Sequence, residues 1–241
     1  MALNRTPSVS KSLRRRRILA VLAGGLVLGV GGTMTLASWT DSEWVWGGAD
    51  GGPGIGTSEF VVLQNTLSPA NGDVATGWVE EPDNPGGELV FSPLTVGDDI
   101  LALTPGETFY APVALKTSDT SIAGTVDLLG AVAAAGVTVD DAGDLLWDNL
   151  GARVALEILP AADTAPTCDQ AYFAAAGVDV IVGAGGAAPL DTAGLADQPI
   201  SGGGDDVHYY CFEISLPDNA VTQTLQGRTV APAWQFFSTS V

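Results

Sequence analysis

The sequence has few residues of the kinds on which catalysis most often depends. Its 241 residues include one histidine, two cysteines and nine lysines and arginines. One histidine, His208, cannot by itself build a histidine-rich zinc site or the HExxH motif of metalloproteases. No GxSxG occurs, and the Gly-rich stretches lack the Lys-Ser/Thr pair of a phosphate loop. We therefore predict no catalytic residue, no metal site, no cofactor and no enzymatic activity.

Positive charge is almost absent beyond the first 37 residues. Only Lys116, Arg153 and Arg228 remain there against all 28 acidic residues, which is a formal charge of −25. Such a chain repels nucleic acid and anionic lipid, which bind basic patches. Loop carboxylates such as Asp140, Asp141 and Asp144 could ligate calcium, but their spacing does not match the EF-hand loop. Solvated acidic turns are the simpler interpretation.

The basic residues are concentrated before a long apolar run. Lys11 and the four arginines 14–17 precede an apolar stretch from Ile18 to Ala37 that ends in small residues. A basic flank, an apolar helix and a small-residue boundary are the parts of a secretory signal peptide. We predict a signal helix in residues 1–37 and cleavage by a signal peptidase between Ala37 and Ser38. A retained anchor is the alternative, because about 20 apolar residues can span a bilayer.

Export bears on the two cysteines, Cys168 and Cys211. An even number of cysteines in an oxidising compartment favours a disulfide. Closing a loop of about 40 residues stabilises the fold by about 3–4 kcal/mol in the chain-entropy model. The alternative is two unpaired buried thiols.

Residues 57–241 predict a β-sandwich domain. Alternating or β-branched runs at 108–116, 153–159 and 207–216 are typical of strands, and weaker runs lie at 59–63, 88–91 and 228–238. Pro232 inside the last run indicates an edge strand or a bulge. His208 lies in the most strand-like run, so we interpret it as structural. The alanine-rich run 168–176 is the one predicted helix. We expect an all-β, jelly-roll-like antiparallel sandwich with one short helix.

Between the signal helix and this domain lies an aromatic segment, Trp39-Thr40-Asp41-Ser42-Glu43-Trp44-Val45-Trp46. The Gly-rich residues 47–56 that follow are a flexible linker by composition. The segment is therefore either an aromatic strand that a flexible linker leaves free to bind elsewhere, or the first strand of its own domain.

The boundary between signal and segment resembles a known export signal. The stretch 31–43, GGTMTLASWTDSE, is similar to the signals that SipW-type signal peptidases process. In those signals a Gly-Thr pair precedes the alanine, and an aromatic residue and a Ser/Thr/Asn-Asp-x-Glu element follow. Trp39 and Thr40–Glu43 occupy these places. The turn Thr104–Glu107 and the Cys211 strand also resemble that family.

The resemblance points to the TasA/camelysin-like exported proteins and their actinobacterial relatives. It implies a jelly-roll fold and assembly into extracellular or biofilm-matrix fibres, in which an N-terminal strand of one subunit completes the sheet of the next. Part of that family is also labelled as metallopeptidase, but this sequence lacks the metal ligands that such an activity needs. We expect a secreted or cell-surface structural protein whose partner is itself. A monomeric binding module, with Trp78 or Trp147 as carbohydrate-binding residues, is the alternative.

Overall fold

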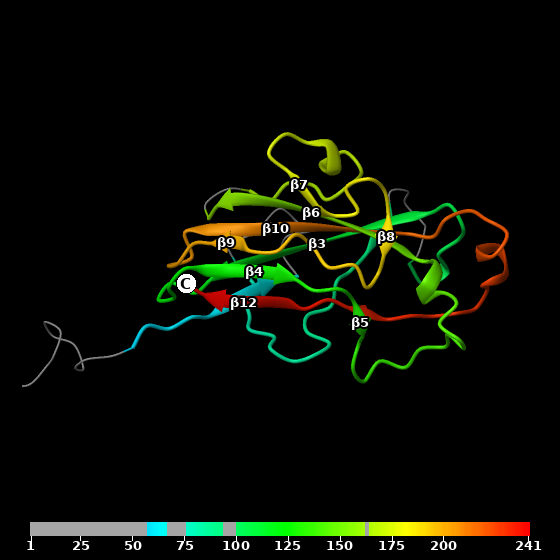
Figure 1. Ribbon diagram of the computed structural model, residues 1–241, viewed down its shortest axis with the longest axis horizontal. Coiled ribbons are helices and arrows are strands. Elements are labelled where there is room, and N and C mark those ends of the chain that lie inside the picture. The colour runs from blue at the N-terminus through cyan, green and yellow to red at the C-terminus, as the bar shows by residue number, and fades with distance from the viewer. Residues whose placement is uncertain (1–56, 67–75, 94–99, 162–163) are drawn as a thin grey trace, which may run out of the picture. The chain divides into compact units, whose positions relative to one another are not determined.

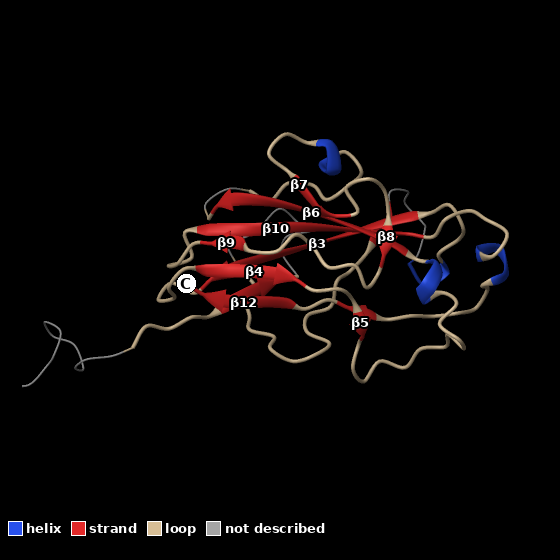
Figure 2. Cartoon of the chain, in the orientation of Figure 1, coloured by secondary structure: helices blue, strands red, loops and turns tan. Residues whose placement is uncertain are grey.

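The computed structural model describes residues 57–66, 76–93, 100–161 and 164–241 (Figure 1). They belong to one compact unit that spans Thr57–Val241. The predicted signal helix, the cleavage residues Ala37 and Ser38 and the aromatic segment lie outside the described residues. The described part is almost entirely strand and loop (Figure 2).

The larger sheet has the order β1-β3-β10-β6-β7, and every pairing in it is antiparallel. Its main strands are β1 (Val62–Asn65), β3 (Thr108–Thr117), β10 (Asp206–Ser215), β6 (Gly151–Pro160) and β7 (Asp179–Val182). Two short strands extend it, because β2 (Ser92–Pro93) pairs with β3 and β8 (Ala188–Pro189) pairs with β6. The three long strands β3, β6 and β10 confirm the runs predicted at 108–116, 153–159 and 207–216.

Two smaller sheets complete the described fold. One has the order β12-β4-β9, made of β12 (Phe236–Ser240), β4 (Gly124–Leu128) and β9 (Gln198–Ile200). The other pairs β5 (Val132–Ala133) with β11 (Pro232–Ala233). The predicted run at 228–238 is therefore split into β11 and β12. Pro232 lies on an outer strand, as expected of a residue that cannot donate to a ladder.

Both faces of the larger sheet are covered, so its central strand β10 is buried from Val207 to Ile214. One face, with Leu115 and Tyr210, packs against Leu128 of β4 and Phe236 of β12. The opposite face carries Tyr209, which packs with Tyr172 and other residues of the segment 164–178. Side chains alternate between the two faces along a strand, so β10 buries apolar groups on both sides. The all-β, sandwich-like class is confirmed.

The helix predicted at 168–176 is wrong in length and type. The structure has a single 3₁₀ turn there, η4 (Tyr172–Ala174), opened by Asp169, whose carboxylate accepts from the Ala171 and Tyr172 amides. The Tyr172 ring meets that of Tyr209 edge-on at 5.6 Å. This packing overrides the alanine propensity, since a short helix depends on tertiary contacts. The other described helices are also single 3₁₀ turns: η2 (Ile100–Ala102), η3 (Trp147–Asn149) and η5 (Thr222–Thr224).

Two shorter predictions also need correction. The run 88–91 forms no strand. The pairing of this stretch with β3 is confined to the next two residues, Ser92–Pro93. The run 59–63 is displaced, since β1 begins at Val62. In both places the sequence pattern covers four or five residues, too few to fix a boundary when tertiary pairing decides it.

Candidate functional site: an apolar groove beside strand β12

A large groove opens between the two layers of the fold, with a volume of about 1410 Å³. Its floor is the inner face of the larger sheet, including Val62 of β1 and Val113 and Leu115 of β3. Its opposite wall is formed by Trp234 and β12. Further apolar lining residues include Leu89, Phe91, Leu103, Leu146, Leu150, Ile214, Leu216 and Leu225.

Aromatic packing fixes the β12 wall of the groove. The Phe236 ring lies 4.8 Å from that of Tyr210, and Trp234 lies 5.0 Å from Phe212, both measured between ring centroids. Tyr210 and Phe212 are fully buried on β10, so each wall residue is held by a residue of the other layer. Aromatic pairs at these distances add to the stabilisation from area burial. The wall is therefore a rigid element of the groove.

Strand β12 presents an edge with backbone groups directed away from β4. The Leu129 amide donates to the Gln235 carbonyl at 2.9 Å, and the Val241 amide donates to Ala123 at 3.2 Å. Alternate residues of an antiparallel strand bond to the same neighbour, so Phe237 and Thr239 also face β4. The N–H and C=O groups of Phe236, Ser238 and Ser240 then point outward. Within the described residues β12 is an outer strand of its sheet.

A fixed ledge, residues 79–88, borders the groove on the β1 side. The Gln64 and Val79 backbones exchange two hydrogen bonds, at 2.8 and 3.0 Å. Farther along, the Asn84 side chain donates to the Ala133 carbonyl at 3.1 Å and accepts from the Ala135 amide at 2.7 Å. A Cβ at Gly87 would come within 3.1 Å of the Gln64 side chain, so the ledge lies close against β1.

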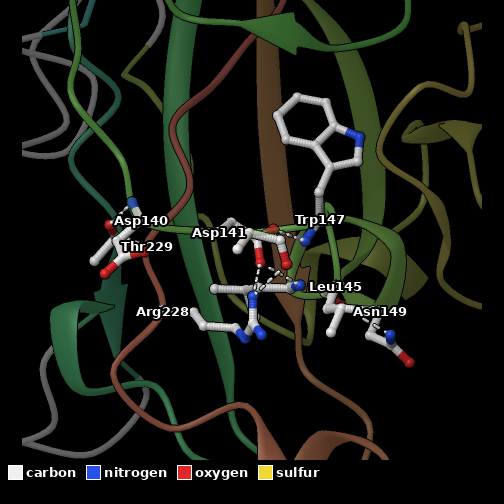
Figure 3. Close-up of polar contacts among 9 residues, drawn as sticks. Asp140, Asp141, Leu145, Trp147, Asn149, Arg228 and Thr229 are labelled. Atoms are coloured by element: carbon white, nitrogen blue, oxygen red, sulfur yellow. Dashed lines mark hydrogen bonds and ion pairs between the residues drawn. The ribbon is translucent and has the colours of Figure 1, made fainter.

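An ion pair organises the loop at one end of the groove (Figure 3). Arg228, which lines the groove, contacts the Asp141 carboxylate at 3.0 Å and donates to the Ala142 carbonyl at 2.8 Å. Asp141 also accepts from the Leu146 and Trp147 amides, both at 2.9 Å. Burial raises the pKa of Asp141, but these hydrogen bonds and Arg228 outweigh it, so its pKa is lowered overall.

This geometry shows what the acidic loop at 140–144 does in the fold. Both carboxylate oxygens of Asp141 are engaged, by the loop amides and by Arg228. The Asp140 amide donates to the Thr229 hydroxyl at 2.9 Å. Within the described ranges, no three His, Cys, Asp or Glu side chains are grouped so that they could hold a metal ion.

The predicted disulfide between Cys168 and Cys211 is present, with the two Cα atoms 5.3 Å apart. Cys211 is buried on β10, and Cys168 belongs to the segment 164–178 that covers the outer face. Arg153 of β6 stacks on Phe173 of this segment at 4.4 Å and pairs with Glu213 at 3.2 Å. Burial and the neighbouring Glu213 raise the pKa of Tyr110 to about 12 on this face. These contacts give the segment 164–178 a structural role on this face of the sheet.

His208 lies buried between β10 and β9. Its Nε2 is 2.9 Å from the Pro199 carbonyl, which can only accept, so Nε2 carries the proton. Nδ1 is then the acceptor for the Tyr210 hydroxyl at 3.3 Å. Burial lowers the pKa of His208, while the charge of Asp206 and the bond to Pro199 oppose the shift. The neutral imidazole thus links the two layers.

The two tryptophans considered as sugar platforms are both engaged in the fold. Trp78 is half-buried, and the Lys116 ammonium lies over its ring at 5.0 Å from the centroid. Trp147 is half-buried in η3 and packs with the cluster around Leu146 and Leu150. The aromatic segment Trp39–Trp46 lies outside the described residues.

Sequence reasoning missed the groove because its walls come from parts of the chain far apart in the sequence. One signal was present: Trp234, Phe236 and Phe237 are three aromatics within four residues, at and just before strand β12. A strand that is half polar and half aromatic suits a wall that is buried on one side and open on the other.

Searches against protein-family models and against curated proteins found no match to this chain. In the part of the chain that the structure describes, no helix has the length and apolar character needed to cross a bilayer.

Proposed function

We propose that this protein is an exported, non-enzymatic structural protein that assembles into extracellular or biofilm-matrix fibres by strand addition. The segment Trp39–Trp46 of one copy occupies the groove beside β12 of the next copy. The observation that supports this most directly is the coincidence of an apolar groove with an outward-facing β12 edge. An edge of this kind is a template for another strand.

The proposal includes the steps that place the protein outside the cell. A signal peptidase removes residues 1–37, so that Ser38 becomes the first residue and contact with the membrane is transient. The Cys168–Cys211 disulfide supports this route, since disulfides persist in oxidising compartments. The jelly-roll topology and the relation to the TasA/camelysin-like proteins belong to the same proposal.

The segment has one face that suits the groove. In an extended strand Thr40, Ser42, Trp44 and Trp46 share a face, and that face carries no charge. Asp41, Glu43 and Val45 share the other face with Trp39. Burying Trp44 and Trp46 against Phe236 and the sheet floor removes apolar surface from water, while the backbone bonds to β12.

The linker 47–56 is long enough to connect neighbouring copies. Ten extended residues span about 33 Å, which is comparable to the diameter of a small domain. Its glycines leave the segment free to enter a second copy without straining the first domain.

Electron microscopy of the purified chain that begins at Ser38 tests this function. We expect filaments from the full mature chain and folded monomers from a variant that lacks residues 38–46. The matched pair Trp44→Ser/Trp46→Ser and Trp39→Ser separates the two faces: the first abolishes filaments and the second retains them. Filaments that persist without residues 38–46 contradict the proposal.

The alternative, a monomeric carbohydrate-binding module, has less support from the geometry. The Lys116 ammonium lies over the Trp78 ring, and Trp147 packs against the cluster around Leu146 and Leu150, so both rings are partly covered. A mature chain that stays monomeric at high concentration by light scattering and binds glycans would favour this alternative.

A further inference from the structure

The charged residues that line the groove are unevenly distributed. Among the described lining residues, four carry carboxylates and only Arg228 is basic. The carboxylates all belong to the ledge: Glu80, Glu81, Asp83 and Glu88. All four residues are exposed. The apolar groove therefore has a negative border on the β1 side.

This negative border is held in place. The ledge is bonded to β1 at Val79 and to the chain at 133–135 through Asn84, so both anchors lie within or next to the run of carboxylates. The charges consequently cannot withdraw from the groove as a free loop would. Their separation from an occupant is set by the fold.

Among the residues that the structure describes, no basic side chain of the groove compensates this border. The guanidinium of Arg228 is already paired with Asp141 and bonded to the Ala142 carbonyl. Lys116 lies over Trp78, and Arg153 is paired with Glu213 on the opposite face of the sheet. An occupant that carries its own negative charge meets uncompensated repulsion at the border.

We propose that the ledge carboxylates are an electrostatic gate that makes strand insertion dependent on ionic strength. This inference rests on the proposed function, because the occupant is the segment Trp39–Trp46. Asp41 and Glu43 share the face of that segment that is turned away from the groove, toward the border and solvent. The carboxylates of the segment and of the ledge repel each other at low salt. Added salt screens this repulsion, because the Debye length is only about 10 Å at 0.1 M.

The gate gives the monomer a period of protection during export. Repulsion slows the association of two copies and also disfavours the binding of other acidic partners, since like charges at an interface lower association rates. Assembly then begins where ions or a cationic matrix component neutralise the border. The apolar groove and β12 provide the attraction, and the ledge sets the conditions under which it acts.

The test compares two variants with the same change in charge. The ledge variant is Glu80→Gln/Glu81→Gln/Asp83→Asn/Glu88→Gln. The control is Asp119→Asn/Asp179→Asn/Asp191→Asn/Asp205→Asn, whose four exposed carboxylates do not line the groove. The critical concentration for filament formation by the mature chain is measured by sedimentation from 20 mM to 500 mM NaCl at pH 7, where roughly 500 mM reduces the Debye length to about 4 Å.

We expect the ledge variant to assemble at a critical concentration about tenfold lower than the parent at low salt, with little further change on adding salt. A tenfold change corresponds to about 1.4 kcal/mol. The control should shift much less and keep the parent's salt dependence. Equal shifts in both variants overturn the gate, because net charge would then explain assembly.

Failure of the gate and failure of the proposed function give different results. Filaments whose critical concentration is the same in parent and ledge variant overturn the gate alone. No filaments in any variant at any salt concentration overturn the proposed function, and the gate with it. Circular dichroism and thermal unfolding confirm that the ledge variant keeps the parent's fold.

Discussion

His208 is the one histidine of the chain, and its side chain is buried where β10 meets β9. Nε2 donates to the Pro199 carbonyl, and in the neutral ring, which burial favours, Nδ1 accepts from the Tyr210 hydroxyl. Tyr210 in turn packs on Phe236, which lines the groove. A single residue therefore connects the interior hydrogen bonds to the β12 wall.

The lowered pKa of His208 predicts how stability depends on pH. The unfolded chain binds a proton near the ordinary pKa of about 6.5, whereas the folded chain binds it only at lower pH. Stability is therefore fully present above pH 6.5 and is lost as the pH falls toward the folded pKa, by at most about 1.4 kcal/mol per pH unit.

Urea unfolding of the mature chain and of His208→Gln between pH 7.5 and about 5 measures this loss, around the ordinary histidine pKa. The parent should lose stability across the interval. The variant should be less stable at pH 7.5 but change little with pH, since glutamine does not titrate. Parallel pH dependences in the two proteins would show that His208 is not the titrating group.

At the scale of elements, the segment 164–178 is held on the outer face of the larger sheet by a disulfide and by aromatic packing. Cys168 bonds to Cys211 of β10, Tyr172 packs on Tyr209, and Phe173 packs under Arg153. The segment has only the single turn η4 of regular structure. Its position depends on these cross-links rather than on its own backbone bonds.

Removing the disulfide should destabilise the whole domain. We expect Cys168→Ala/Cys211→Ala to lose about 3–4 kcal/mol, the value for a cross-link that closes a loop of this length. Denaturant unfolding of the parent, oxidised and reduced, and of the variant measures it. Reductant should lower the stability of the parent to that of the variant and leave the variant unchanged. Unequal values would mean that the substitutions act through packing.

Strand β12 is the second element whose behaviour can be predicted. The Ser238 amide points away from β4, so a proline there removes no bond within the described sheet. In the proposed fibre the same amide donates to the incoming strand. Ser238→Pro should therefore leave a folded monomer that forms no filaments, while Ser238→Ala assembles normally. Proline at this position with normal filaments would exclude β12 as the acceptor edge.

At the scale of the whole molecule, the long strands were predictable and the arrangement of the layers was not. Runs such as Val207–Leu216 contain enough β-branched and aromatic residues to predict a strand from the sequence alone. Strands of two residues, such as β5 and β11, have no pattern of their own, because pairing with each other creates them. The helix prediction at 168–176 was wrong for a related reason, because the aromatic residues of that run pack against the larger sheet.

The candidate site depends on the same long-range arrangement. Val62 on β1 and Phe236 on β12 lie far apart in the sequence but line one groove. The ledge carboxylates looked like an ordinary turn, and only the anchors at Val79 and Asn84 show that they border this groove. Cys168 and Cys211, by contrast, were paired correctly because there are only two cysteines to pair.

In the proposed fibre, the aromatic segment of one copy lies in the β12 groove of another. Cross-linking between two distinguishable chains tests it most directly. One chain carries a photoreactive phenylalanine in place of Trp44, and the other is isotopically labelled and lacks residues 38–46. After illumination of the mixture, mass spectrometry identifies the labelled peptides that are joined. We predict cross-links from position 44 to groove residues such as Leu115 and Phe236 of the labelled chain. Cross-links confined to one chain, or directed to the outer face at 164–178, would contradict the account.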